Sequence, residues 1–149
     1  MTNHAHDPEF ADRVRASFAK QHAMDLIHAT LPVVEPGLTE IHLPHWAGVE
    51  QQHGFVHGGV VGMIADSAAG YAAMTLVSAS ASVLTVEYKM NLVAPADGEK
   101  LVARGKVVRP GRTTRPRAIS LSPSAGAIRF ILYSTVSTDA PAGTTVIAA

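Results

Sequence analysis

The chain has 149 residues, which suits one domain with a single core, and it is 47% hydrophobic but only 16% charged. Its 12 basic and 12 acidic residues give a formal net charge of zero, which argues against the clustered basic face of a nucleic-acid-binding protein. The lack of cysteine excludes a disulfide framework, a thiol nucleophile and a thiolate metal site.

The first residues, MTNHAHDPEF, lack the basic start and apolar run of a signal peptide, so we expect a soluble, cytoplasmic protein. Residues 1–7 are expected to be disordered. An aspartate and a proline at 7–8 then offer an N-cap and a first-turn proline. Phe10, Val14 and Phe18 recur at helical spacing, which predicts an amphipathic helix from residue 8 to about 24.

A strand and a long apolar helix are predicted next. The segment LTEIHLP, residues 38–44, alternates apolar and polar side chains as a half-buried strand does. After a loop, HWAGVEQQHGFV, the helix begins near Gly58 or Gly59 and ends near Val77. It holds four glycines, many alanines and one charged residue, Asp66, and therefore predicts a buried helix rather than a membrane span.

Four strands in succession complete the predicted order, at residues 82–95, 101–109, 118–122 and 127–136. ADGE and PGR supply turn chemistry between them, and no repeat or long linker divides the chain. We therefore expect residues 1–149 to form one α+β domain, with an alanine-rich helix lying against an antiparallel sheet.

Asp66 is the most informative residue of the long helix. An unpaired buried charge is costly, so Asp66 either has a structural partner or serves as a general base or nucleophile in a dry cleft. The N–H groups of Gly58 and Gly59 at the helix start have no partner within the helix. They either form a tight turn or polarise a carbonyl group and stabilise an oxyanion.

The spacing of Gly58 and Asp66 bears on oligomeric state. Eight residues of helix correspond to roughly 12 Å along the axis, so one substrate carbonyl cannot touch both groups of one helix. If both act on one bond, they come from two copies of the chain. The catalytic interpretation therefore predicts a two-fold dimer with antiparallel central helices and two equal sites.

The motif GFVHGG, with an aspartate nine positions after His57, and the run DSAAGYAAM resemble the hotdog-fold thioesterases of the PaaI-like, phenylacetic-acid-degradation family. The later VEYKMNLVAPADGEKLVARGKVVRPGR does so too, and the resemblance covers about residues 10–112. It implies a hotdog fold, in which an antiparallel sheet wraps around a long central helix, here with an N-terminal helix. It also implies sites at dimer interfaces, usually in a dimer of dimers.

The resemblance implies hydrolysis of an acyl-CoA thioester, with coenzyme A as part of the substrate and no other cofactor. Asp66 falls on the family's helix carboxylate, which acts as the base that activates water or as the nucleophile. Gly58 falls on the oxyanion-hole glycine, whose amide faces the thioester oxygen. Gly59, the second glycine of the motif, is a further candidate for substrate binding.

Four polar residues around the helix take further roles by the same resemblance. Gln51 falls on a side-chain amide where several members have asparagine, and His57 would orient the loop. Thr85, with Ser82 as the alternative, falls on the hydroxyl that helps to hold water in some members.

Three basic residues are candidates for binding the phosphates of coenzyme A. Arg109 and Arg112 flank a Pro-Gly turn, and Lys89 lies on the preceding strand, although each also fits a solvated strand end. No Walker-type loop or dinucleotide fingerprint is present. The eight histidines include no helical pair beside a glutamate, so we expect no metal site.

The resemblance fades after Arg112. Pro116 and Pro123 stand where two paired strands should meet, although proline belongs at sheet edges or turns. This end is either a divergent variant or the product of a shifted reading frame, which the intact mass of the protein distinguishes.

Two other functions stay open on this fold. One is non-catalytic binding of an acyl-CoA or a small ligand, and the other is a hydratase or dehydratase, against which HGG with an aspartate at nine residues argues. The acyl group itself is open among phenylacyl, hydroxybenzoyl and medium-chain fatty acyl groups. Met63, Tyr71 and Met74 either shape the pocket or belong to the core.

Overall fold

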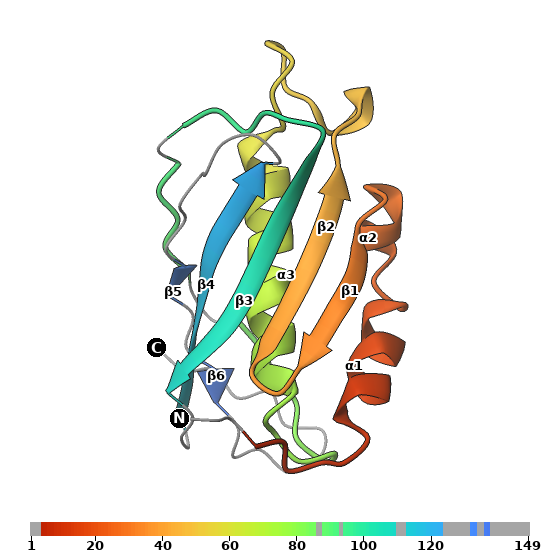
Figure 1. The fold of residues 1–149 in the computed structure, drawn as a ribbon, viewed down its shortest axis with the longest axis vertical. Helices are drawn as coiled ribbons and strands as arrows, with labels where there is room; N and C mark the ends of the chain where they lie inside the picture. The colour runs from red at the N-terminus through yellow and green to blue at the C-terminus, as the bar shows by residue number, and fades with distance from the viewer. Residues whose placement is uncertain are drawn as a thin grey trace.

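A long helix lies behind an antiparallel sheet in the computed structural model (Figure 1), which describes residues 4–85, 88–92, 94–109, 113–123, 132–133 and 136–137. Two short helices, α1 and α2, lie beside the first strand. The elements in chain order are α1 (Phe10–Phe18), α2 (His22–Leu26), β1 (Thr30–Glu35), β2 (Leu38–Pro44), the 3-10 turn η1 (Ala47–Val49), α3 (Gly58–Met74), β3 (Lys100–Arg109), β4 (Thr113–Pro123), β5 (Leu132–Tyr133) and β6 (Val136–Ser137). This arrangement confirms the predicted α+β class.

The sheet has the order β1-β2-β3-β4-β5, with β6 also paired to β4, and every pair is antiparallel. In β2 the buried positions alternate with less buried ones, so Thr39, Ile41 and Leu43 share one face. Ala103 of β3 pairs with Ile41 and is buried as well. This buried face packs against α3, which confirms both the 38–44 strand and the amphipathic reading of it.

The backbone of α3 touches the sheet directly at one point. A Cβ atom on Gly105 of β3 would lie 2.1 Å from the carbonyl oxygen of Ala68, so only glycine fits there. The same oxygen accepts a buried hydrogen bond of 2.7 Å from the Thr39 hydroxyl. The residues of α3 around this contact are small and buried: Ala65, Ala68, Ala69 and Ala72. Small side chains thus allow the helix to lie close to the strands.

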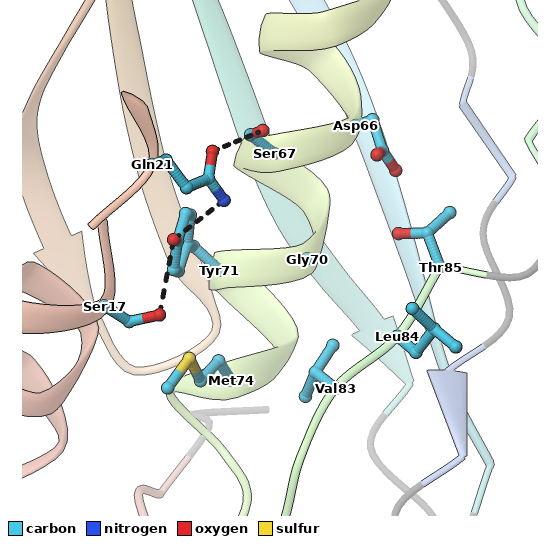
Figure 2. Close-up of a pocket in the computed structure, with 10 residues that line it drawn as sticks. All are labelled: Ser17, Gln21, Asp66, Ser67, Gly70, Tyr71, Met74, Val83, Leu84 and Thr85. Atoms are coloured by element: carbon cyan, nitrogen blue, oxygen red, sulfur yellow. Dashed lines mark hydrogen bonds between the residues drawn. The ribbon is translucent and has the colours of Figure 1, made fainter. Parts of the chain in front are cut away.

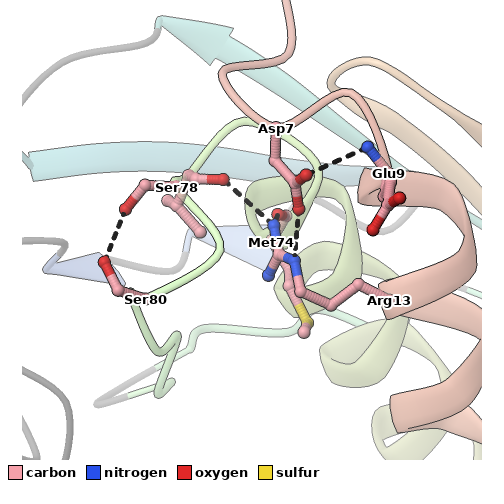
Figure 3. A network of polar contacts seen from close by, with 7 residues as sticks. Asp7, Glu9, Arg13, Met74, Ser78 and Ser80 are labelled. Atoms are coloured by element: carbon pink, nitrogen blue, oxygen red, sulfur yellow. Dashed lines mark hydrogen bonds and ion pairs between the residues drawn. The ribbon is translucent and has the colours of Figure 1, made fainter.

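Arg13 ties the N-terminal segment to the C-terminal end of α3 (Figure 3). Its Nη2 donates to the carbonyl oxygens of Met74 at 3.1 Å and Val77 at 3.0 Å, where a helix end leaves carbonyls unpaired and favours a cation. Its Nε forms a 2.8 Å ion pair with Asp7. Asp7 is therefore buried and paired, which corrects the expected disorder at this residue.

The single helix predicted from residue 8 to about 24 is wrong in its extent, because α1 ends at Phe18 and α2 begins at His22. The backbone of Gln21 leaves the helical region, with φ −83° and ψ 87°. Its side chain instead bonds to the Tyr71 hydroxyl of α3 at 2.9 Å. A tertiary contact therefore replaces helix continuation at this point.

The strand β1 was not predicted, because Pro32 and Pro36 mark a turn-rich segment. Pro32 lies at a register shift between Thr30 and Val33, on a strand at the edge of the sheet. Both settings tolerate a residue without an N–H group.

The predicted strand at 82–95 is absent from its described residues, 82–85, 88–92 and 94–95. Between residues that the structure describes, no backbone hydrogen bond involves 82–92. A strand forms only when its N–H and C=O groups bond to those of a neighbouring strand. The strand-like sequence pattern was therefore not enough to predict a strand here.

The predicted strand at 118–122 lies within the longer β4. Pro116 pairs with Val107 inside β4, next to a register shift that ends at Arg109. Such an irregularity accommodates proline within a sheet. Of the strand predicted at 127–136, residues 132–133 and 136 are in strands, and the others lie outside the described residues. No helix in the described part of the chain is long and apolar enough to cross a membrane.

We expect Gly105→Ala to lower the free energy of unfolding by about 1–3 kcal/mol or more, because the new methyl group overlaps the α3 backbone. Gly70→Ala is the matched control, since its Cβ would lie 3.9 Å from the nearest atom, the Thr85 hydroxyl oxygen. Alanine within a helix should raise stability there by about 0.5–1 kcal/mol. Urea denaturation measures both changes, and an unchanged midpoint for Gly105→Ala would contradict the direct contact.

Candidate active site

One face of α3 carries Gly58, Gly62, Asp66 and Gly70, spaced one helical turn apart. The chain that follows α3 runs back along this face. An added Cβ would lie 3.9 Å from Thr85 Oγ1 at Gly70, 3.2 Å from the Tyr88 hydroxyl at Gly62 and 2.9 Å from Leu92 Cδ1 at Gly58. The glycines leave room for this segment, and Asp66 is the only one of these four residues that has a side chain.

A cavity of about 290 Å³ lies beside Asp66 (Figure 2). It opens to solvent and is bounded by the end of α1 with Gln21, by α3 and by residues 83–85, so segments distant in sequence form its walls. The lining residues are Ser17, Gln21, Asp66, Ser67, Gly70, Tyr71, Met74, Val83, Leu84 and Thr85. The cavity therefore brings together two of the predicted catalytic residues, Asp66 and Thr85.

The Asp66 carboxyl group is poorly solvated. Its Oδ1 atom is shielded from solvent and has no hydrogen-bond partner among the described residues. Burial raises the pKa of Asp66 above its usual value, and the Thr85 hydroxyl, which faces the carboxyl group in Figure 2, acts in the opposite direction. A carboxylate in this setting is a stronger base than one in water.

The two glycine N–H groups at the start of α3 differ in their hydrogen bonding. His57 is the N-cap residue, and its Nδ1 accepts a 2.9 Å hydrogen bond from the Gly59 N–H. The Gly58 N–H makes no hydrogen bond with any described residue. An unused amide at a helix start favours negative charge. Gly58 does not line the Asp66 cavity of its own chain.

Gln51, Ser82 and Lys89 are not among the residues that line this cavity. The side-chain oxygen of Gln51 accepts a hydrogen bond from the His53 N–H within the loop before α3. Ser82 and Lys89 are exposed. The side chain of Arg109 and all of Arg112 lie outside the described residues.

Several lining residues were missed by sequence reasoning. Ser17, Gln21 and Ser67 were not singled out, because the contacts that join Ser17 and Gln21 to α3 span 46 to 54 residues of chain. Of the three residues considered for the pocket, Tyr71 and Met74 line it and Met63 does not. No group of three or more histidine, aspartate or glutamate side chains is placed to hold a metal ion within the described ranges.

The comparisons with known proteins agree with this geometry. The family model described as the thioesterase superfamily matches residues 53–114. The crystal structure of a thioesterase family protein from Silicibacter pomeroyi is 39% identical, with a TM-score of 0.80, and the match covers 87% of this chain and 97% of that chain. This chain belongs to the thioesterase superfamily.

Solved structures with lower sequence identity share the fold. The Escherichia coli PaaI protein from the phenylacetic acid degradation operon is 14% identical over 90% of this chain and 96% of that chain, with a TM-score of 0.79. A Haemophilus influenzae thioesterase is 17% identical over 86% of this chain and 89% of that chain, with a TM-score of 0.76. No curated protein sequence matches significantly. The predicted hotdog fold and PaaI-like resemblance are thus confirmed.

The raised pKa of Asp66 makes a prediction for stability. From about pH 4 upward, Asp66 loses its proton in the unfolded chain but keeps it in the folded chain. The free energy of unfolding therefore falls as the pH rises from about 4 to the raised pKa of the folded protein. Asp66→Asn stays neutral and should be more stable than the unaltered protein at pH 7. The difference should close as the pH falls toward about 4, as measured by urea denaturation across that range.

Asp7→Asn is a control in which the expected change in stability at pH 7 has the opposite sign. Hydrogen bonding to Arg13 lowers the pKa of Asp7, so its stabilising contribution is present above about pH 4 and is lost as pH falls through the lowered value. This variant should be less stable at pH 7, with a deficit that shrinks in acid. Equal pH dependence of the two variants would contradict the burial of Asp66.

Proposed function

We propose that this chain hydrolyses acyl-CoA thioesters to the free acid and coenzyme A. The observation that carries the proposal is the solvent-shielded Asp66 oxygen, which has no partner among described residues and borders a cavity beside the Thr85 hydroxyl. Membership of the thioesterase superfamily supplies the reaction class. A buried carboxylate at a cavity suits proton transfer, whereas a structural aspartate would have its oxygens paired.

In the proposed reaction, the Asp66 carboxylate takes a proton from water as the water oxygen attacks the thioester carbonyl carbon. Negative charge then develops on the carbonyl oxygen, where the Gly58 N–H stabilises it. The C–S bond breaks as the oxyanion collapses, and the proton passes from Asp66 to the departing sulfur. Direct attack by Asp66 would give an acyl anhydride that water cleaves, and it requires the same ionised carboxylate.

The site that we propose needs two copies of the chain. Gly58 and Asp66 are about 12 Å apart along one helix, so the Gly58 amide of one copy serves Asp66 of the other. The segment that crosses α3 leaves large apolar side chains exposed, with exposed fractions of 43% for Leu84, 47% for Tyr88 and 52% for Leu92. A run of exposed apolar side chains on an unpaired extended segment suits an interface between subunits. Such dimers can pair further into a dimer of dimers.

Asp66→Ala should lower thioester hydrolysis by about 10²–10⁴-fold while the fold persists, because the base is lost. Thiol release from a panel of phenylacyl, hydroxybenzoyl and medium-chain acyl-CoAs measures the effect and names the acyl class. Undiminished hydrolysis in this variant would refute the role of Asp66. Tight binding of the esters by the folded protein without any thiol release would instead establish a non-catalytic binding protein.

Gly58→Pro removes the N–H group that is proposed to stabilise the oxyanion, and it should have little effect on the stability of α3. Proline is favoured at the first helical position, and the extended backbone of His57 (φ −61°, ψ 132°) is the conformation that a residue before proline prefers. The variant lacks the Gly58 N–H and should lose about 10²–10³-fold in kcat. Gly58→Ala is the matched control, since it also adds a carbon near Leu92 but keeps the amide. Equal losses in both variants would attribute the effect to crowding.

Subunit mixing tests whether the two groups come from different copies. Neither Asp66→Ala nor Gly58→Pro alone should be active, but a mixed dimer holds one site with both lesions and one site with none. Co-expression in equal amounts makes half of the dimers mixed, so about a quarter of the unaltered activity should return. No recovery in verified mixed dimers would show that one chain supplies both groups.

A further inference from the structure

A polar wall closes the cavity on the side opposite Asp66 and Thr85 (Figure 2). It joins the N-terminal helices to α3 through side chains that the proposed reaction does not use. We call these four residues the polar wall: Ser17, Gln21, Ser67 and Tyr71. Met74, Val83 and Leu84 add apolar surface to the same cavity.

Hydrogen bonds hold Gln21 in place at the centre of the polar wall. Its Nε2 donates to the Tyr71 hydroxyl at 2.9 Å, and its Oε1 accepts from the Ser67 hydroxyl at 3.4 Å. Ser17 and Tyr71 share a further hydroxyl contact of 3.4 Å. Because Tyr71 is only 5% exposed, the Gln21 amide is anchored on a rigid part of α3.

The Gln21 amide has hydrogen-bonding capacity to spare. A primary amide carries two N–H donors and two acceptor positions. Contacts with described residues use one donor and one acceptor position. One of each is thus available to a ligand in the cavity that Gln21 lines.

We propose that Gln21 determines specificity by binding a hydroxyl or oxo group at the far end of the acyl group. The inference rests on the proposed thioesterase function, because the thioester must lie at Asp66. Ser67 follows Asp66 directly and points about 100° further around the helix. An acyl group whose thioester lies at Asp66 and that extends across the cavity therefore ends at the polar wall on the opposite side (Figure 2).

The preference follows from desolvation. A hydroxyl at the end of the acyl group replaces the water that the free amide positions of Gln21 otherwise bind. An alkyl or unsubstituted phenyl end displaces that water and leaves the amide positions unpaired, which is unfavourable. The cavity therefore selects acyl groups with a polar end over apolar analogues of similar size.

Matched substrate pairs test the inference: 4-hydroxyphenylacetyl-CoA against phenylacetyl-CoA, and 6-hydroxyhexanoyl-CoA against hexanoyl-CoA. We expect the unaltered protein to favour the hydroxylated member of at least one pair by roughly tenfold in kcat/KM. Gln21→Met keeps the side-chain volume but removes the amide, and the ratio should fall to about one. His22→Met introduces the same residue at the exposed neighbouring position and should keep the ratio.

Equal kcat/KM within both pairs would overturn the inference, as would a ratio that Gln21→Met leaves unchanged. Tyr71→Phe provides a second variant, because it removes the hydroxyl that anchors Gln21 and should also reduce the ratio. Thermal melts of each variant verify that it is folded.

Binding separates failure of this inference from failure of the proposed function. Calorimetry measures the Kd of the same four esters for Asp66→Asn, with and without Gln21→Met. One outcome is that the unaltered protein hydrolyses no ester, whereas Asp66→Asn binds the hydroxylated members more tightly and Gln21→Met removes that preference. This outcome would support the role of Gln21 and refute the proposed thioester hydrolysis. Equal Kd values within each pair, or no binding of any ester, would overturn the role of Gln21.

Discussion

The contact between the backbone of α3 and the strands β2 and β3 determines the rest of the structure. At Gly105 the sheet has no side chain, and the Ala68 carbonyl lies where a Cβ would be. The Thr39 hydroxyl gives that carbonyl a second hydrogen bond in a setting without water. Because the contact fixes both the depth and the rotation of α3, it also fixes which helix face is turned away from the sheet. That outer face carries Asp66.

Asp66 is tolerated because the fold supplies space beside it. Gly62 and Gly70 flank it one turn away on each side, and the chain after α3 passes over them. The carboxyl group is thereby partly removed from bulk water without an ion pair to any described residue, and this burial raises its pKa at a cost in stability. Asp7, by contrast, forms an ion pair with Arg13. The contrast between the two aspartates supports a functional rather than a structural reason for Asp66.

The sequence predicted the parts of the molecule that local chemistry determines. Alternation located β2, and the two glycines of the HGG motif, Gly58 and Gly59, located the start of α3, which the structure places at Gly58. Asp66 was singled out because burying an unpaired charge in an apolar helix is energetically unfavourable. The break at Gln21 and the unpaired segment at 82–92 could not be predicted, because each depends on a distant partner or on its absence among the described residues. The polar wall has the same origin, since no periodicity links α1 to Tyr71.

Two regions of the chain thus contribute different properties to one cavity. The family model covers residues 53–114, which include the start of α3, Asp66 and Thr85. Ser17 and Gln21 come from outside that range, Ser17 from α1 and Gln21 from the link between α1 and α2, and both contact Tyr71 of α3 through their side chains. Substitutions there would change the end of the cavity while leaving the α3–sheet contact and the Asp66 carboxyl group in place. Under the two proposals, the group that reacts and the group that selects lie on different elements, so the acyl preference can change without a change in the reaction class.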